Sequence, residues 1–239
     1  MIDKIPTGIA GLDEMLYGGL VKGRPYLVAG GPGAGKTILC MQFLMDGVKN
    51  NEKGLYLALE EQAEEIREDM TLFGWNINRI KMIDTMQDIS NGVWSLRTSG
   101  AVSKPEFNLR NLVSVIKEKV DDYQPQRLVV DSLTSIKMLY ENRMSARKEI
   151  LGLMNALSKF GCTTLMTSEA SGPETLMEEF LASGVIKMLI IEEKGERFHA
   201  VVIQKMRGSK FDTHVRPMKI TDEGIVVYPN ESIFKSDSI

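Results

Sequence analysis

The feature that most constrains this chain is a glycine-rich octapeptide at residues 30–37, GGPGAGKT, which follows an apolar run and precedes an amphipathic pattern. It fits the pattern G-x-x-x-x-G-K-[ST] without a mismatch. Its glycines let the backbone N–H groups turn inward around a phosphate, and the N-terminus of the following helix adds partial positive charge at the same place. The octapeptide therefore predicts a phosphate-binding loop between a strand and a helix.

Two side chains of this loop have predicted roles of their own. Lys36 supplies a mobile cation for the β- and γ-phosphates of a nucleotide, and the Thr37 hydroxyl is a ligand for Mg²⁺. We expect ATP or ADP to be bound with Mg²⁺ by Gly31, Pro32, Gly33, Ala34, Gly35, Lys36, Thr37 and Ile38. The sequence has no dedicated motif for the base, so the choice between ATP and GTP stays open.

Apolar runs alternate with helical patterns along the first two thirds of the chain. Runs typical of buried strands occupy residues 26–29, 55–59, 80–83, 128–130 and 164–166. Apolar residues at helical spacing occur within residues 38–48, 60–73, 109–120 and 147–160. Strands that alternate with helices predict βαβ units and a parallel sheet covered on both faces.

The last third of the chain changes character. Residues 185–191 and 198–206 flank a short polar turn, and so do residues 218–220 and 225–228. Each pair of runs is typical of an antiparallel hairpin. We therefore predict an α/β fold whose central sheet begins parallel and ends in antiparallel hairpins.

Length and charge narrow the class of protein. The 239 residues contain no linker and no internal repeat, which fits one domain over residues 1–229 and a flexible tail over 230–239. A net charge of −3 argues against a protein whose main task is to coat duplex DNA. Cys40 and Cys162 lie in apolar surroundings, so we expect buried thiols. Without a signal pattern or a membrane-length apolar run, the chain is expected to be cytoplasmic and to have no membrane partner.

A second motif, which contains an aspartate, lies at the end of a predicted strand. Residues 127–132, RLVVDS, place Asp131 directly after three apolar residues. Ligands of open α/β folds collect at the carboxyl ends of the strands, and an aspartate at this place holds Mg²⁺ in P-loop proteins. We therefore predict that Asp131 is a metal ligand together with Thr37. Taken alone the pattern is weak, because many buried strands end in an aspartate that caps the next helix.

Two adjacent glutamates, Glu60 and Glu61, follow the apolar run at 55–59. If the strand continued through them, their side chains would point to opposite sides of the sheet. Only one would then face the γ-phosphate and orient the attacking water. The competing interpretation is a solvated start of the next helix, since the following residues remain acidic.

Two cations, Lys205 and Arg207, follow the apolar residues 201–203, and Gly208 comes directly after them. Their spacing of two places both on one face of a strand. Cations at a strand end neutralise charge that develops on a transferring phosphoryl group. A solvated basic tip is the alternative interpretation of the same pattern.

The order of these motifs resembles that of one family. Residues 7–20, TGIAGLDEMLYGGL, followed by Gly23, resemble the entry segment of RecA-like ATPases of the KaiC and RadA group. The family's later motifs follow in order: the loop at 30–37, LEE at 59–61, VVDS at 129–132, KMRGS at 205–209, PMKI at 217–220 and GIVVYP at 224–229. The resemblance covers residues 4–229 as a single KaiC-type domain.

For the fold, the resemblance implies a RecA-like P-loop NTPase, an α/β protein with a largely parallel central sheet flanked by helices and with C-terminal antiparallel hairpins. The strand at 164–166 is implied to lie between the strand before the loop and the strand that ends at Asp131. Two departures affect the implied subunit interface. Phe211 stands where the family often has a histidine, and Ser183 begins a segment that the family commonly writes Asp-Gly-Val.

For the site, the resemblance implies that Glu60 activates water and that Glu61 assists it. It implies that Lys205 and Arg207 reach the nucleotide of a neighbouring subunit, so that the active site forms only between protomers. Ser168, at the end of another strand, falls where the family has a polar sensor near the γ-phosphate. Glu60, Glu61, Lys36, Lys205 and Arg207 are thus the predicted catalytic residues.

The leading functional hypothesis is a Mg²⁺-dependent ATPase that forms a homo-oligomeric, hexameric ring with a regulatory task. One alternative is a RadA-like accessory of DNA recombination or repair that binds DNA through residues 85–107 or 170–181. It is not favoured, because the second segment contains Glu174, Glu178 and Glu179 and no basic residue. The other is a slow nucleotide sensor or autokinase that acts on an unknown protein partner.

Overall fold

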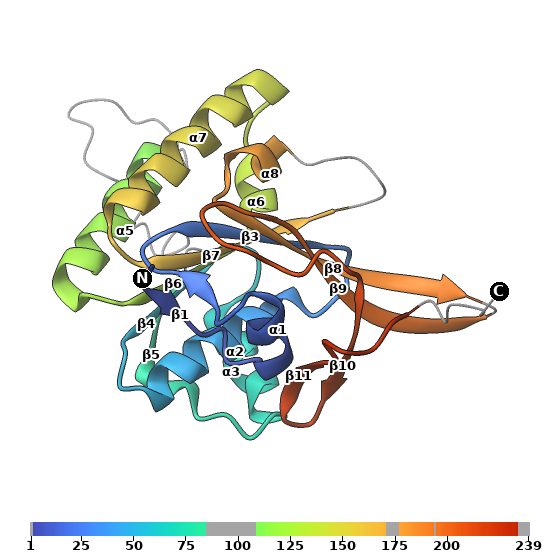
Figure 1. The fold of residues 1–239 in the computed structure, drawn as a ribbon. Coiled ribbons are helices and arrows are strands. Elements are labelled where there is room, and N and C mark those ends of the chain that lie inside the picture. The colour runs from blue at the N-terminus through green and yellow to red at the C-terminus, as the bar shows by residue number, and fades with distance from the viewer. Residues whose placement is uncertain (1, 85–108, 171–176, 194, 234–239) are drawn as a thin grey trace, which may run out of the picture.

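The computed structural model describes residues 2–84, 109–170, 177–193 and 195–233, and its centre is a mixed sheet (Figure 1). The strand order in this sheet is β11-β10-β9-β8-β3-β7-β6-β4-β5. Its strands are β3 (Pro25–Gly30), β4 (Gly54–Ala58), β5 (Ile80–Asp84), β6 (Arg127–Asp131), β7 (Thr163–Glu169), β8 (Gly184–Glu193), β9 (Glu196–Met206), β10 (Arg216–Thr221) and β11 (Gly224–Val227).

The pairing of these strands confirms the predicted fold class. The six strands from β8 to β5 in the sheet order pair in parallel, and β8 to β11 pair antiparallel. The strand β7 lies between β3 and β6, as the family resemblance implied. A small ladder of β1 (Lys4–Ile5) and β2 (Leu20–Val21) stands apart from this sheet.

Helices cover both faces of the sheet (Figure 1). On one face lie α1 (Ala10–Met15), α2 (Lys36–Lys49) and α3 (Ala63–Thr71), and a 3₁₀ turn, η1 (Ile77–Arg79), precedes β5. On the other lie α5 (Leu109–Tyr123), α6 (Leu133–Met138), α7 (Arg143–Lys159) and α8 (Met177–Leu181). The sheet is therefore enclosed by helices, as parallel sheets require.

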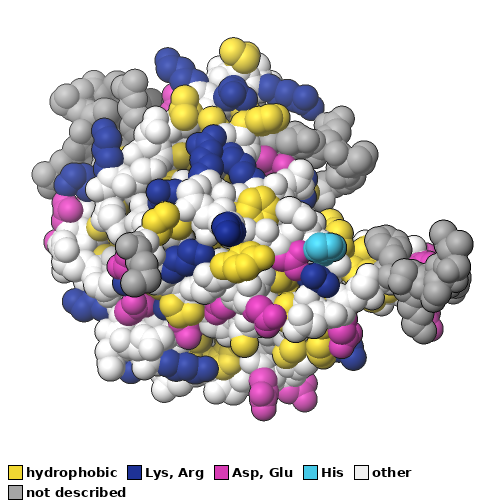
Figure 2. All heavy atoms as spheres, in the orientation of Figure 1, with side chains coloured by type: hydrophobic (Ala, Val, Ile, Leu, Met, Phe, Trp, Pro, Cys, Tyr) yellow, Lys and Arg dark blue, Asp and Glu magenta, His cyan; other side chains and the backbone are white. Residues whose placement is uncertain are grey.

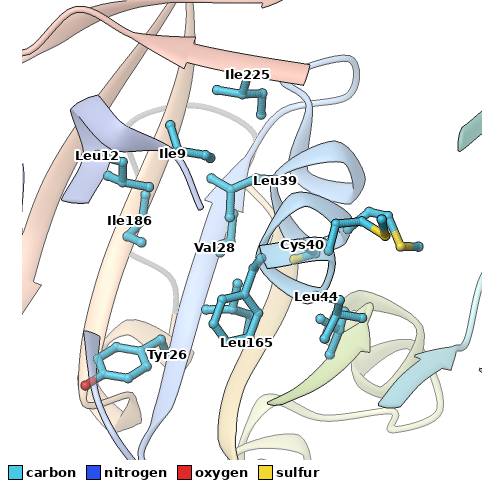
Figure 3. Packing of buried hydrophobic residues seen from close by; sticks show 14 of the residues in the cluster. Ile9, Leu12, Tyr26, Val28, Leu39, Cys40, Leu44, Leu165, Ile186 and Ile225 are labelled. Atoms are coloured by element: carbon cyan, nitrogen blue, oxygen red, sulfur yellow. The ribbon is translucent and has the colours of Figure 1, made fainter. Parts of the chain in front are cut away.

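The period of two along β3 divides the core into two clusters. Tyr26 and Val28 pack with α2 on one face, and Leu27 and Ala29 pack with the opposite helices on the other. Figure 3 shows the first cluster, in which side chains of β3 meet Leu39 and other α2 side chains. Alternate residues of one strand thus pack in different hydrophobic clusters, one on each face of the sheet. This alternation decides which side chains reach the helix that follows the glycine-rich loop.

Some elements differ from the prediction. The helix expected over residues 60–73 begins only at Ala63, because residues 60–62 bend away from the end of β4 before the helix starts. The short elements α1, α6, β1 and β2 were not predicted, since two to six residues carry no measurable periodicity. Cys40 and Cys162 are buried free thiols, and burial raises the pKa of Cys162 to about 11.

Several sequence predictions concern residues outside the described ranges. The segment 85–107 lies wholly outside them, and so do parts of the segments 170–181 and 230–239. Among the helices that are described, none is long and apolar enough to cross a lipid bilayer.

A buried arginine ties several segments together at the amino end of the sheet. Arg127, at the start of β6, has no solvent exposure, and its guanidinium donates to Glu52 at 2.6 Å and to Asp46 at 2.8 Å. It also donates to the carbonyl oxygens of Pro6 at 3.1 Å and Phe43 at 2.5 Å. A buried charge with four acceptors is satisfied, so Arg127 joins the N-terminal segment, α2 and β6.

Replacing Arg127 with Met should destabilise the fold strongly. The variant removes the guanidinium donor from two half-buried carboxylates, from the part-buried carbonyl oxygen of Pro6 and from the buried one of Phe43, which costs about 3–5 kcal/mol of unfolding free energy. Urea denaturation measures this loss. The matched control is Lys117→Met, which removes the exposed Lys117–Asp121 ion pair and should cost about 0.5 kcal/mol or less. Equal losses in the two variants would contradict a central role for Arg127.

Candidate functional site

The carboxyl ends of the parallel strands surround one cavity of about 580 Å³. Because the strands run in the same direction, the loop after β3 and the residues that end β4, β6 and β7 lie at one edge of the sheet. The cavity is lined by Pro32, Gly33, Gly35, Lys36, Thr37, Ile38, Tyr56, Glu60, Glu61, Ile66, Asp69, Met70, Leu72, Phe73, Asp131, Glu169 and Ile220. Most residues of the predicted phosphate loop are therefore on its wall.

The glycine-rich loop has the backbone that its sequence predicts. Gly33 and Gly35 have φ angles of 74° and 92°, which residues with a Cβ atom rarely adopt. A Cβ atom at Gly35 would also stand 3.0 Å from Ile220. The helix α2 begins directly afterwards at Lys36, so its first N–H groups open towards the cavity. Of the other loop residues predicted to bind nucleotide, Ala34 is buried in the core and Gly31 lines a separate cavity beside β8.

Lys36 lies over the start of the loop. Its Nζ atom donates to the carbonyl oxygens of Gly30 and Gly31, both at 3.0 Å. No carboxylate of the described residues forms an ion pair with it. The ammonium charge is thus held at the loop by neutral oxygens, which leaves it available to an anion.

The carboxylate of Asp131 accepts hydrogen bonds from three hydroxyl groups. Thr37 Oγ1 donates to Oδ2 at 3.0 Å, and Tyr56 Oη donates to the same oxygen at 2.5 Å. Thr167 Oγ1 donates to Oδ1. Carboxylate and hydroxyl oxygens are hard donors of the kind that Mg²⁺ takes, so the two residues predicted as metal ligands, Thr37 and Asp131, lie together and fit such an ion.

Tyr56 and Thr167, which hold Asp131, are site residues that sequence reasoning missed. Both lie on the sheet face that packs against α2, as Asp131 does, because Tyr56 is two residues before Ala58, the partner of Asp131. Thr167 pairs with Val28, which faces the same helix. Side chains alternate between the two faces of a strand, and counting this alternation from the strand before the loop could have indicated both residues.

Ser168 lies on the opposite face of β7 from Thr167. Its hydroxyl donates to Glu178 at 2.5 Å and accepts from Lys137 Nζ at 3.0 Å. It is fully buried and does not line the cavity. The sensor role that the resemblance implied for Ser168 stays a prediction, and the structure adds Thr167 as the neighbour that contacts Asp131.

Glu60 and Glu61 both line the cavity. The strand β4 ends at Ala58, so the expected alternation of the two side chains does not arise. Glu60 Oε1 accepts hydrogen bonds from the hydroxyls of Ser132 and Ser135, the latter at 2.7 Å, and the carboxylate is thereby oriented. Burial, followed by the negative charge of Asp131, raises the pKa of Glu61.

Lys205 and Arg207 do not reach this cavity within one chain. Lys205 Nζ donates to the carbonyl oxygens of Glu179 and Phe180 at 2.8 and 3.1 Å, and Arg207 donates to Phe180 at 3.0 Å. These carbonyls belong to the end of α8, whose partial negative charge attracts cations. Burial, and then the adjacent charge of Arg207, lowers the pKa of Lys205.

Comparisons with known proteins agree with this geometry. A family model described as "ATPase: KaiC" matches residues 5–232. A UPF0273 protein from Thermotoga maritima is 35% identical over 245 residues, which cover 97% of this chain and 98% of that protein. One from Aeropyrum pernix is 32% identical, with coverage of 98% and 96%.

One solved structure is similar to this chain over the full length of the solved protein. The crystal structure of a KaiC-like protein from the hyperthermophilic archaeon Pyrococcus horikoshii superposes with a TM-score of 0.83. The two chains share 34% identity, and the match covers 96% of this chain and 100% of the other.

Replacing Glu61 with Gln should stabilise the protein at neutral pH. Because the folded-state pKa of Glu61 is raised above the ordinary 4.5, the wild type loses stability as the pH rises from about 4.5 through the folded-state pKa. Glutamine has no charge to desolvate. The urea midpoint of Glu61→Gln should therefore exceed that of the wild type at about pH 8 and match it at about pH 4. A difference that is the same at both pH values would refute this origin.

Proposed function

The chain belongs to the KaiC family of ATPases, and from that membership we propose that it binds ATP with Mg²⁺ and hydrolyses it. The observation that carries the proposal is the contact between Thr37 and Asp131 beneath the glycine-rich loop. It joins the start of α2 to the end of β6, so a hydroxyl and a carboxylate meet beside the ammonium group of Lys36. Phosphate and divalent-cation chemistry need this set of groups in one place.

The proposed binding roles follow from charge. Lys36 and the N–H groups at the start of α2 bind the phosphates, and Thr37 and Asp131 hold Mg²⁺. When bound, Mg²⁺ neutralises charge on the β- and γ-phosphates. Ile38, Phe73 and Ile220 form an apolar part of the cavity wall, which suits the flat face of a base.

Glu60 is the proposed catalytic base. Its carboxylate lines the cavity and is held by two serine hydroxyls, so it is oriented before any substrate arrives. It orients a water molecule and accepts a proton from it while the water oxygen bonds to the γ-phosphorus and the bond to the ADP oxygen breaks. Glu61, on the same wall, assists by adding negative charge beside the water.

Lys205 and Arg207 are proposed to act on the nucleotide of a neighbouring protomer. Neither lines the cavity of its own chain, and the side chains of both donate hydrogen bonds to backbone oxygens at the end of α8. A residue that acts across a head-to-tail interface requires a ring or a filament, and we propose a homo-oligomeric ring of six subunits. Both cations then stabilise charge on the phosphoryl group in the transition state.

We further propose that residues 1–229 form one catalytic domain and that the protein is a cytoplasmic regulator that signals to a protein partner through its nucleotide state. The family match over residues 5–232 supports the domain. On the face drawn in Figure 2, Lys and Arg side chains are more frequent in the upper part and acidic side chains in the lower part. The net charge of −3 favours a protein partner over nucleic acid.

Glu60→Gln should slow hydrolysis by orders of magnitude without affecting nucleotide binding. Loss of a general base lowers turnover about 10²–10⁴-fold, whereas the loop and the metal ligands remain. Phosphate release and binding of a fluorescent ATP analogue measure the two effects. Glu64→Gln is the control, because Glu64 lies in the first turn of α3, does not line the cavity and pairs only loosely with Arg67, at 3.8 Å. Unchanged turnover in Glu60→Gln would remove Glu60 from the mechanism.

Mixing two inactive variants tests the shared site. Lys36→Ala lacks the cation of the glycine-rich loop, and Arg207→Ala lacks a cation that is proposed to act on the neighbouring subunit. A ring that contains both variants therefore has some interfaces at which Lys36 and Arg207 are both intact. Equal mixing should restore activity at about a quarter of the interfaces. Mass measurements of tagged subunits verify that exchange has occurred. Absence of activity in rings that have exchanged would show that each protomer works alone.

A further inference from the structure

The side chain of Asp131 is held from the two strands that flank it. Tyr56 reaches it from β4 and Thr167 reaches it from β7, and both side chains are fully buried. β6 lies between these two strands in the sheet. Each carboxylate oxygen thus has a donor from a different neighbouring strand, so rotation about the bond to the carboxylate would break at least one hydrogen bond.

The donors of Asp131 are neutral. No lysine or arginine of the described residues forms an ion pair with Asp131, in contrast to Asp46, which pairs with Arg127. A cationic partner would orient the carboxylate but would also cancel its charge. Hydroxyl groups orient it and leave the negative charge to attract a cation.

The third donor, Thr37, is itself a proposed metal ligand. Its role therefore differs from that of Tyr56 and Thr167, which are not proposed to touch the metal. Thr37 belongs to the loop and helix that would hold the phosphates, whereas Tyr56 and Thr167 project from the sheet beneath Asp131, with Tyr56 also lining the cavity wall. Outer groups of this kind hold metal ligands in the geometry that the ion requires. Their loss typically weakens metal binding by about 10–100-fold.

We propose that Tyr56 and Thr167 are positioning residues for the metal ligand Asp131, and that they set the affinity of the site for a divalent cation. The inference rests on the proposed function, because it requires Asp131 to ligate the cation. It assigns to two buried hydroxyl groups a role that their burial alone does not demand.

The test is metal binding by isosteric variants. Mn²⁺ is titrated into the full-length protein with saturating ADP, and free Mn²⁺ is measured by electron paramagnetic resonance. Tyr56→Phe and Thr167→Val each remove one hydroxyl and keep the shape of the side chain. Each should weaken Mn²⁺ binding by about 10-fold, while the affinity for ADP in excess chelator stays within about 2-fold of the wild type.

Two matched controls separate positioning from the general cost of losing a buried hydrogen bond. Tyr26→Phe removes a buried tyrosine hydroxyl that donates to Val21 at 2.9 Å. Thr164→Val removes a buried threonine hydroxyl of β7 that donates to Cys162 at 3.4 Å. Both controls should bind Mn²⁺ as the wild type does, even where their urea midpoints fall as far as those of the test variants.

Steady-state kinetics supply a second measurement. In Tyr56→Phe the Mg²⁺ concentration for half-maximal activity should rise about 10-fold, while kcat at saturating Mg²⁺ stays near that of the wild type. A lower kcat with an unchanged Mg²⁺ requirement would overturn the positioning role.

Asp131→Asn distinguishes failure of this inference from failure of the proposed function. If Asp131→Asn loses Mn²⁺ binding and the Tyr56 and Thr167 variants keep wild-type affinity, the positioning roles are overturned and the metal site stands. If Asp131→Asn binds Mn²⁺ as tightly as the wild type, both the metal site and the positioning roles are overturned.

Discussion

The parallel ladder of β3, β7 and β6 is the constraint on which the site depends. Its backbone hydrogen bonds align Gly30 with Glu169 and Val130 with Met166, so the loop after β3 and the acid that ends β6 emerge at the same edge. The helix α2 must then start above that edge, and Thr37 in its first turn meets Asp131. An antiparallel pair would send the two chain ends to opposite edges of the sheet, and no contact of this kind would form.

The groups that stabilise the fold and the groups that form the candidate site lie at opposite ends of the same ladder. Its amino end is closed by the buried Arg127 with its four acceptors, and both faces are packed against helices. Its carboxyl end collects carboxylates around one cavity, where burial and mutual repulsion raise the pKa of Glu61. Negative charges this close together repel one another, and a divalent cation held as in the proposed function would relieve that repulsion.

The antiparallel half of the sheet has a different place in the proposed mechanism. The β8–β9 ladder pairs Val185 with Lys205, near the start of β3, whereas the loop follows the end of β3. Lys205 and Arg207 therefore lie away from the glycine-rich loop of their own chain and contact the end of α8. In the proposed mechanism the loop and the two cations would be complementary parts of one site at separate places on the chain, an arrangement that suits head-to-tail assembly.

Local patterns were sufficient for much of this protein. The fold class and the candidates Lys36, Thr37 and Asp131 follow from contiguous motifs, because a strand–loop–helix motif carries its own geometry. The strand order around β7 and the choice of Glu60 over Glu61 came from the family resemblance. The roles of Tyr56 and Thr167 could not be found in that way. They depend on the phase of each strand and on the register between strands, and a shift of one residue would exchange Thr167 for Ser168 at the site. Sequence by itself determined which groups the chain possesses at its strand ends, and only the packing of the sheet against α2 decided which of them share a face with Asp131.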